Sequence, residues 1–185
     1  ASGYGALFSN TTGSNNTASG RQALYTNTTG NDNTASGYLA LYSNTEGNDN
    51  TASGSYALFS NTTGTTNTAT GYRALFDNTT GSGNTASGYE ALNSNDGSYN
   101  TSSGYRSLRA NTSGDYNTAF GSLALYSNTE GSGNLALGYK AGYSETGSNK
   151  LYISSYDESN SAERDLITGD FSTGDLSLGQ TSGTV

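Results

Sequence analysis

The sequence predicts an all-β fold, namely a parallel β-solenoid or β-roll of about nine coils. A block of about 17 residues recurs along nearly the whole chain, and it begins at Ala1, Ala18, Ala35, Ala52, Ala69, Ala86, Ser102, Ala119 and Ala136. Repetition at a fixed period indicates identical units stacked on one another, and a unit this short has no room for a pair of helices. The 185-residue chain also lacks Pro, which would remove a backbone donor from a stacked ladder.

The composition narrows the classes of function. Hydrophobic residues make up 31% of the chain, which has no His, Cys, Met or Trp. Such low hydrophobicity is typical of disordered chains, but a disordered chain has no reason to place Leu at the same phase of eight repeats. The net charge of −8 argues against nucleic acid as a partner, and no apolar run is long enough for membrane insertion. Because the chain starts in mid-pattern without Met, we expect a segment of a longer protein.

Glycine and leucine stand at fixed places in the repeat. The third residue is Gly in all nine repeats, where we expect a turn with positive φ or crowded backbone: Gly3, Gly20, Gly37, Gly54, Gly71, Gly88, Gly104, Gly121 and Gly138. The seventh residue is Leu in eight repeats and forms the predicted core row: Leu7, Leu24, Leu41, Leu58, Leu75, Leu92, Leu108 and Leu125. The fifth residue varies in type, so we expect it to face water.

Two short strands are predicted in each coil. The first covers Asn-Thr-Ala-Ser, as in residues 33–36, and the second covers Ala-Leu-Tyr-Ser-Asn, as in residues 40–44. A Thr-Thr-Gly segment then gives the wider turn. One repeat has 16 residues, because Asn95-Asp96-Gly97 stands where the others have Asn-Thr-Thr-Gly. A deletion in a turn leaves the register of the strands intact, which supports this assignment.

The second predicted strand is a reason to expect self-association. Its first three residues are apolar in succession, as in residues 40–42, and neighbouring side chains of a strand point to opposite faces. One face fills the inside of the coil, while the other needs a cover that a single chain does not provide. We therefore expect a homo-oligomer in which sister chains supply that cover.

Residues 1–135 form the predicted repeat domain of eight coils, and residues 136–185 form the last partial coil and an irregular β cap. After Ala136 the repeat decays, and three irregular strands are expected at 150–154, 164–168 and 175–178. A solenoid needs a closing element, because an open strand edge is a template for aggregation.

The repeat resembles the head repeats of trimeric autotransporter adhesins of the YadA type, and related repeats of bacteriophage tail fibres. The likeness is carried by Asn-Thr-Ala-x-Gly-Tyr-x-Ala-Leu at 33–41 and 84–92, and by the later segments 149–153, 166–174 and 176–179. The resemblance implies a left-handed parallel β-roll, three chains about one axis and a role in attachment. The repeat is longer than that of the adhesins, and Ser mostly stands where they have a β-branched aliphatic residue.

Several rows of like residues are candidate sites. We expect the Asn rows at the tenth and sixteenth positions to form amide ladders between coils rather than a ligand site. The Tyr row at the fourth position and the aromatic row at the eighth favour packing over a sugar-binding strip. The Thr11-Thr12 row suggests an ice-binding face, but Glu46, Asp96 and Glu130 interrupt it. Acidic turns at 30–33 and 47–50 do not recur in every coil, which argues against a Ca²⁺ site.

Asn-x-Ser/Thr sequons are candidate glycosylation sites; they lie at Asn10, Asn15, Asn27, Asn61, Asn78, Asn100 and Asn111. We expect no catalytic residue, metal or cofactor, because the chain has neither His nor Cys. Paired carboxylates can hydrolyse a polysaccharide, but a solvated loop better explains the one dense acidic cluster, which contains Asp157, Glu158, Glu163 and Asp165.

Together these observations predict a structural segment of an elongated extracellular fibre, on a virion or a cell surface. The expected assembly is a homotrimer, and the expected role is to project or form an attachment region. The main alternative is a bacterial surface adhesin or matrix filament whose coils bind a host receptor or a glycan directly. An ice-binding solenoid and a polysaccharide depolymerase are the remaining alternatives.

Overall fold

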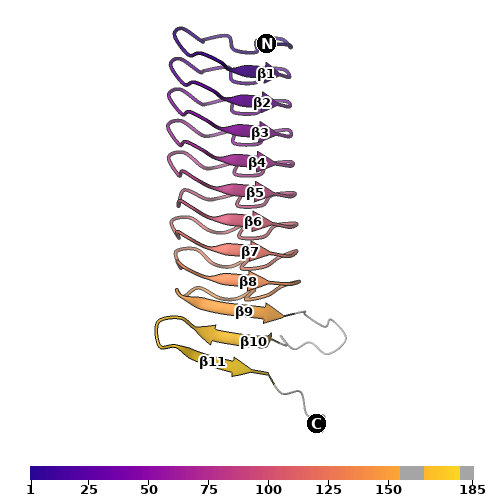
Figure 1. Cartoon of the computed structure of the whole chain (residues 1–185). Helices are drawn as coiled ribbons and strands as arrows, with labels where there is room; N and C mark the ends of the chain where they lie inside the picture. Colours follow the sequence, from indigo (N-terminus) through magenta and orange to yellow (C-terminus); the bar gives the residue numbers. More distant parts are fainter. Residues whose placement is uncertain (155–164, 180–185) are drawn as a thin grey trace.

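The computed structural model describes residues 1–154 and 165–179, which form a solenoid without helices (Figure 1). Their strands lie in one 11-stranded sheet, in sequence order. Eight strands have three residues each: β1 Thr17–Ser19, β2 Thr34–Ser36, β3 Thr51–Ser53, β4 Thr68–Thr70, β5 Thr85–Ser87, β6 Thr101–Ser103, β7 Thr118–Phe120 and β8 Leu135–Leu137. Three are longer: β9 Lys150–Ser154, β10 Asp165–Asp170 and β11 Asp175–Leu178. The prediction of an all-β parallel solenoid is confirmed.

The strands β1–β9 are parallel and in register. Ala35 pairs with Ala52, and equivalent residues pair in the same way from one coil to the next. The step is 16 residues rather than 17 between β5 and β6 and again between β8 and β9. In both places the turn is shorter and the strand pairing is preserved. The first predicted strand of each coil is therefore confirmed.

The second predicted strand is wrong. In the described coils its residues form a turn, and the row leucines have left-handed backbone, with φ between 48° and 54°. This bend directs the consecutive side chains of Ala40 and Leu41 into the same interior, where both are fully buried. A strand would have placed them on opposite faces. The aromatic ring that follows, such as that of Tyr42, is half-buried and stacks on the ring of the neighbouring coil. The two apolar faces expected of this strand are therefore absent from the described coils, and self-association needs another basis.

The core is a narrow column of small and medium side chains. Alanines of β1–β5, β7 and β8 point inward, together with the Ala-Leu pairs of the turns, and the leucines from Leu24 to Leu125 are fully buried. Two columns of buried asparagine run beside them. In the sixth coil Ser102 and Ser107 replace alanines of the core, and their hydroxyls hydrogen-bond each other.

The third-position glycines combine both expected features. Gly54 has a φ of 142°, and a Cβ there would lie 2.5 Å from the carbonyl oxygen of Gly71 in the next coil. A side chain would thus meet both an unfavourable backbone angle and a clash with the neighbouring coil.

The fifth position does not face water as expected. Its side chains are half-buried in most coils, and Glu90 is buried. Arg73 shows why: its guanidinium lies over the rings of Tyr72 and Phe76, with its central carbon 5.4 Å and 5.0 Å from their centroids. The side chain therefore packs along the surface of the coil.

The sheet continues past the last coil as an antiparallel hairpin. Ile167 of β10 pairs with Ile153 of β9, and Leu178 of β11 pairs with Ile167. Strands were expected at 150–154 and 175–178, and both are confirmed; the middle one begins at Asp165 and extends to Asp170. Tyr152 of β9 packs against the end of the core.

Candidate interaction surfaces

The outer face of the sheet carries rows of hydroxyl side chains in β1–β6. In each strand the middle residue points into the coil and is buried, while the flanking residues point outward. The outward residues are Thr17, Ser19, Thr34, Ser36, Thr51, Ser53, Thr68, Thr70, Thr85, Ser87, Thr101 and Ser103. We call this surface the hydroxyl face. It bears no charge, although the chain as a whole has a net charge of −8.

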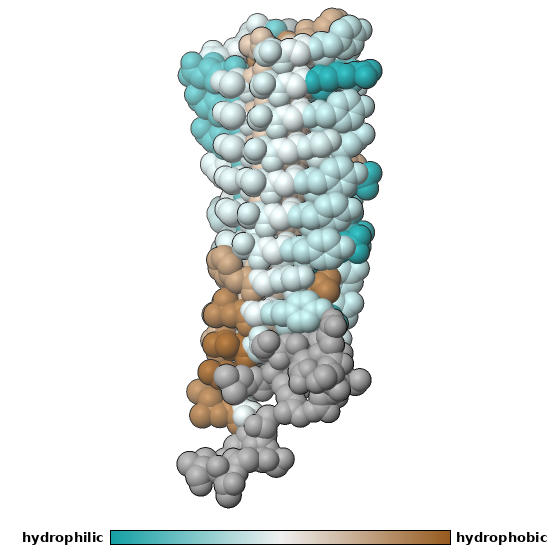
Figure 2. All heavy atoms as spheres, turned by 90° about the vertical axis from the view of Figure 1, so that its right-hand side faces the viewer, coloured by the Kyte–Doolittle hydropathy of each residue, from teal (hydrophilic) through white to brown (hydrophobic). Residues whose placement is uncertain are grey.

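In β7–β11 the same side of the sheet becomes apolar. Its residues are Phe120, Leu135, Leu137, Leu151, Ile153, Ile167, Leu176 and Leu178, and we call this surface the apolar face. Phe120 is 46% exposed, Leu176 63% and Leu178 69%. Figure 2 shows the apolar face as a brown patch below the pale hydroxyl rows. Contiguous exposed apolar surface is typical of an interaction site.

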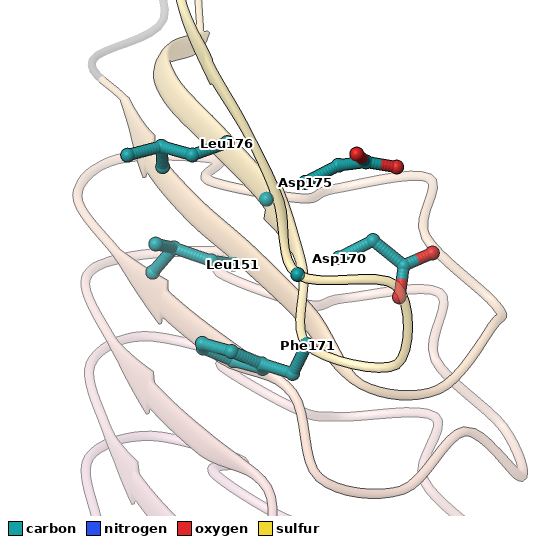
Figure 3. A pocket seen from close by; sticks show the side chains of 7 residues that line it. Leu151, Asp170, Phe171, Asp175 and Leu176 are labelled. Atoms are coloured by element: carbon teal, nitrogen blue, oxygen red, sulfur yellow. The ribbon is translucent and has the colours of Figure 1, made fainter.

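A shallow hollow of about 230 Å³ lies in the apolar face. Its walls include Leu151, Phe171, Leu176 and the backbone of Gly169 and Gly174. Figure 3 shows the three apolar side chains on one side of the hairpin, while the carboxylates of Asp170 and Asp175 point away. The hollow is thus an apolar recess.

The opposite side of the hairpin is polar. The ammonium of Lys150 binds the carboxylate of Asp170, and this hydrogen bond holds the pKa of Asp170 well below its usual range. Nearby, burial favours the neutral form of Glu145. Its hydrogen bonds from the Tyr152 hydroxyl and from the N–H groups of Thr146 and Gly147 outweigh that effect and lower its pKa. Both carboxylates are therefore engaged by donors.

The aromatic rows are stacks whose rings cover one another. Tyr25 and Tyr42 at the eighth position have centroids 5.3 Å apart and nearly parallel planes. At the fourth position the centroids of Tyr72 and Tyr89 are 5.2 Å apart, and those of Tyr89 and Tyr105 are 5.4 Å apart. Because each ring covers the face of its neighbour, these stacks leave mainly ring edges and hydroxyls for solvent. The geometry supports packing rather than a strip on which sugars stack.

The asparagine rows form two hydrogen-bonded ladders inside the solenoid. The Asn61 amide donates to Oδ1 of Asn44 at 2.8 Å and to the carbonyl of Gly64 at 3.0 Å. In the other ladder, Asn50 Nδ2 donates to Oδ1 of Asn33 at 3.1 Å. These amides satisfy backbone groups of the turns, so they are structural.

The sequons divide by burial. Asn27, Asn61, Asn78, Asn100 and Asn111 are fully buried in the ladders, Asn10 is half-buried and Asn15 is exposed. A ladder amide has no room for a glycan in the folded coil, so Asn15 is the sequon that the geometry leaves open.

An ion cluster around the buried Glu90 lies where the eighth-position stack is interrupted by Asn93 and Arg109. Glu90 accepts hydrogen bonds from Nε of Arg106 at 2.8 Å and from Nε of Arg109 at 3.0 Å. Burial would raise the pKa of Glu90, but the two guanidinium groups outweigh it and lower the pKa. This cluster was not predicted from the sequence. Its signal was the pair of opposite charges at the fifth positions of adjacent repeats, residues 90 and 106.

The exposed Thr11-Thr12 row is not the only hydroxyl array. The hydroxyl face was overlooked, although alternation within the predicted Asn-Thr-Ala-Ser strand could have indicated it. Among the described residues, no group of three or more acidic side chains could hold a metal ion. Nor does any described helix have the length and apolarity to cross a membrane. Of the acidic cluster, Asp157, Glu158 and Glu163 lie outside the described residues.

Comparison with protein-family models, with curated proteins and with solved structures gives no match to this chain. The resemblance to adhesin and tail-fibre repeats therefore stays a prediction. What the fold defines is a repeat protein with a β-solenoid architecture.

Proposed function

We propose that this chain is a structural segment of an elongated extracellular fibre, on a virion or a cell surface, in which three copies lie side by side. The observation that carries this proposal is the continuous hydrogen bonding between coils. Within one coil, Thr51 N donates to Asn67 O at 2.8 Å, Leu58 N to Ala74 O at 3.0 Å and Thr62 N to Thr79 O at 2.9 Å. Strand, bend and turn are thus all tied to the next coil.

Such stacking suits a rigid spacer. Each coil contacts its neighbours alone, and the leucine, asparagine and aromatic columns reinforce the backbone ladders. With an advance of roughly 4.8 Å per coil, the eight steps from β1 to β9 span about 38 Å. A rod of this kind holds whatever lies at its two ends apart. The apolar face supports the part of the proposal that concerns neighbouring copies.

The chemistry of the described residues does not favour an enzyme. The buried carboxylate of Glu90 and that of Glu145 are held by donors, and the chain has no His or Cys to act as a base or nucleophile. Polysaccharide cleavage would need two free carboxylates flanking a bound sugar. The geometry supports a mechanical role better than a catalytic one.

Electron microscopy can test the spacer role, with a compact protein fused to each end of the full chain. A rigid rod predicts a narrow distribution of end-to-end separations that covers the solenoid length of roughly 40 Å. Native mass spectrometry of the unmodified chain would show three copies. A broad distribution of separations, or monomers at micromolar concentration, would contradict the proposal.

The hydroxyl face favours a second candidate function, the binding of ice. Its Thr and Ser rows are uninterrupted from Thr17 to Ser103, and they repeat about every 4.8 Å across strands and about 6.6 Å along them. Thermal hysteresis of the purified chain would support this function. Absence of hysteresis in a chain that associates side by side would leave the fibre proposal standing.

Direct binding of a receptor or a glycan remains the alternative role for a surface adhesin. The covered ring faces of the aromatic stacks argue against stacking of sugars there. A glycan array probed with the chain alone would separate a binding module from a passive spacer.

A further inference from the structure

We infer that the apolar face and the hydroxyl face together form the contact with a second copy of this chain, and that the apolar face aligns the copies parallel and in register. This inference rests on the proposed side-by-side assembly. It adds which surface is buried and how the copies are oriented.

The first argument is charge. Two copies that each carry a net charge of −8 repel each other, so the surface between them has to be neutral. The hydroxyl face and the apolar face contain no charged side chain. The acidic residues Asp32 and Asp49 are exposed in the turns instead, and Lys150 pairs with Asp170 on the opposite side of the hairpin. The outer face is therefore the side on which a copy can approach without like-charge repulsion.

The second argument is self-complementarity. The outward residues repeat with the period of the coil, so in a parallel copy in register each coil level faces the same level of its neighbour. Leu137 and Ile153 then face apolar residues, while Ser36 and Thr51 face hydroxyls that can hydrogen-bond. An antiparallel copy aligned over the full length would cover hydroxyl groups with leucine, which costs free energy because the hydroxyls lose water without gaining partners.

The third argument is area. A tail-to-tail pair would overlap only through β7–β11, about 19 Å of sheet, or roughly 300 Å² for a face about 15 Å wide. Stable interfaces bury about 800 Å² per partner. The whole face from β1 to β11 is about 48 Å long and comes much closer to that value. The small apolar end thus sets the register, and the hydroxyl face supplies most of the area.

The location of the contact can be tested with the triple variant Leu137→Ser, Ile153→Ser and Leu178→Ser, which extends the hydroxyl face over the apolar end. The control is the double variant Tyr4→Ser with Phe8→Ser. It removes two exposed aromatic side chains that lie outside the apolar face and the hydroxyl face. Sedimentation velocity over a range of concentrations gives the mass, and circular dichroism verifies the β fold.

We expect the triple variant to stay folded and to associate at least tenfold more weakly, while the control associates like the wild type. If the wild type is monomeric, the proposed assembly itself fails. If the wild type and the folded triple variant associate equally, the assembly stands and this inference is overturned. Should the triple variant unfold, the single variant Leu178→Ser at the exposed end gives the same comparison.

The orientation can be tested separately because the chain has no cysteine. In parallel copies in register, Ser36→Cys and Ile153→Cys would each form a disulfide with its own equivalent on mild oxidation. Tail-to-tail pairing over β7–β11 places β9 against β9, so it would cross-link Ile153→Cys alone. Thr63→Cys, exposed in a turn, is the control that should remain reduced. Cross-linking at position 63 with none at position 36 would overturn the inference.

Discussion

The carboxylate of Asp96 accepts a hydrogen bond from the backbone N–H of Thr80 at 2.7 Å, and the same oxygen accepts those of Thr79 and Gly81 at 2.9 Å and 3.1 Å. In a regular coil a backbone carbonyl takes this place: Thr45 O accepts from the corresponding three residues, 28–30, at 3.0–3.3 Å. The shortened coil lacks that carbonyl, and the aspartate side chain replaces it.

Restoring the missing residue should therefore make the acceptor of Asp96 unnecessary. We expect the variant Asp96→Thr with one further Thr inserted after it to fold with unchanged or higher stability, because it recreates the regular Asn-Thr-Thr-Gly turn. Asp96→Asn at the native length should lose about 1–2 kcal/mol, since the charge that strengthens three hydrogen bonds is removed. Guanidinium unfolding at fixed protein concentration measures both. If Asp96→Asn is as stable as the wild type, the charge of the Asp96 carboxylate contributes little to the free energy of unfolding.

The third-position glycines should tolerate no side chain. Gly54→Ala would place a Cβ 2.5 Å from Gly71 O, so the coils would have to move apart, and we expect a loss of at least about 3 kcal/mol in the free energy of unfolding. Gly174→Ala is the matched control: its φ is 79°, but nothing lies within 4 Å of the added carbon. The control should lose only about 1 kcal/mol. Equal losses in thermal unfolding would mean that backbone angle, not crowding between coils, selects glycine.

The asparagine ladders should depend on their amide donors. Asn61→Asp keeps the shape but leaves Oδ1 of Asn44 and the carbonyl of Gly64 without their donor, in a fully buried place. We expect a loss of about 2–4 kcal/mol. Asn48→Asp makes the same change at a half-buried turn and keeps the acceptor for Asn31 N, so it should lose less than about 1 kcal/mol. Chemical denaturation of the two variants side by side tests this difference.

The ion cluster around Glu90 should make the free energy of unfolding depend on pH. The pKa of Glu90 is lowered on folding from its ordinary 4.5, because the guanidinium groups of Arg109 and Arg106 outweigh burial. Its stabilising contribution is therefore fully present above about pH 4.5 and is lost as the pH falls through the lowered pKa. Glu90→Gln should cost about 2–4 kcal/mol at pH 7. It should also flatten the acid side of the stability profile, although Asp96 and Glu145, whose pKa values are also lowered, keep part of the slope.

An unchanged pH profile in Glu90→Gln would contradict this role. A useful control is Glu46→Gln, at an exposed turn, which should not alter the stability at pH 7 by a measurable amount.

The stacked fold could be predicted because the repeat of about 17 residues is visible in the sequence. Residues 17 apart, such as Ala35 and Ala52, pair directly, and the 16-residue repeat loses its residue in a turn beside Asp96. The turn glycines also followed from their regular recurrence. These features depend on residues of one coil and its nearest copy, so a single sequence contains the information.

The bend that replaces the second predicted strand could not be predicted from the repeat alone. Ala40-Leu41-Tyr42 looks the same whether it forms a strand or a bend, and left-handed backbone at Leu is not expected from its residue type. The burial of each leucine on the next one in the column is the visible gain that accompanies this conformation. This burial exists only when the coils are stacked, so the residues of a single coil do not reveal it.

The full extent of the apolar face could not be predicted from the sequence either. Its part in β7 and β8 follows from alternation around Ala119 and Ala136. Its continuation depends on the antiparallel register that places Leu178 beside Ile167 and Ile167 beside Ile153. Residues of irregular spacing come onto one surface only through that pairing.

The in-register pairing has a consequence for how such a chain changes over generations. If recombination between repeats in the gene removed residues 35–51, Ala18 would pair with Ala52 as it now pairs with Ala35. The alanine, leucine and asparagine columns would keep their partner types, and the molecule would be shorter by one layer. Duplication would lengthen it in the same increments, so heritable variation in reach requires no new side-chain chemistry.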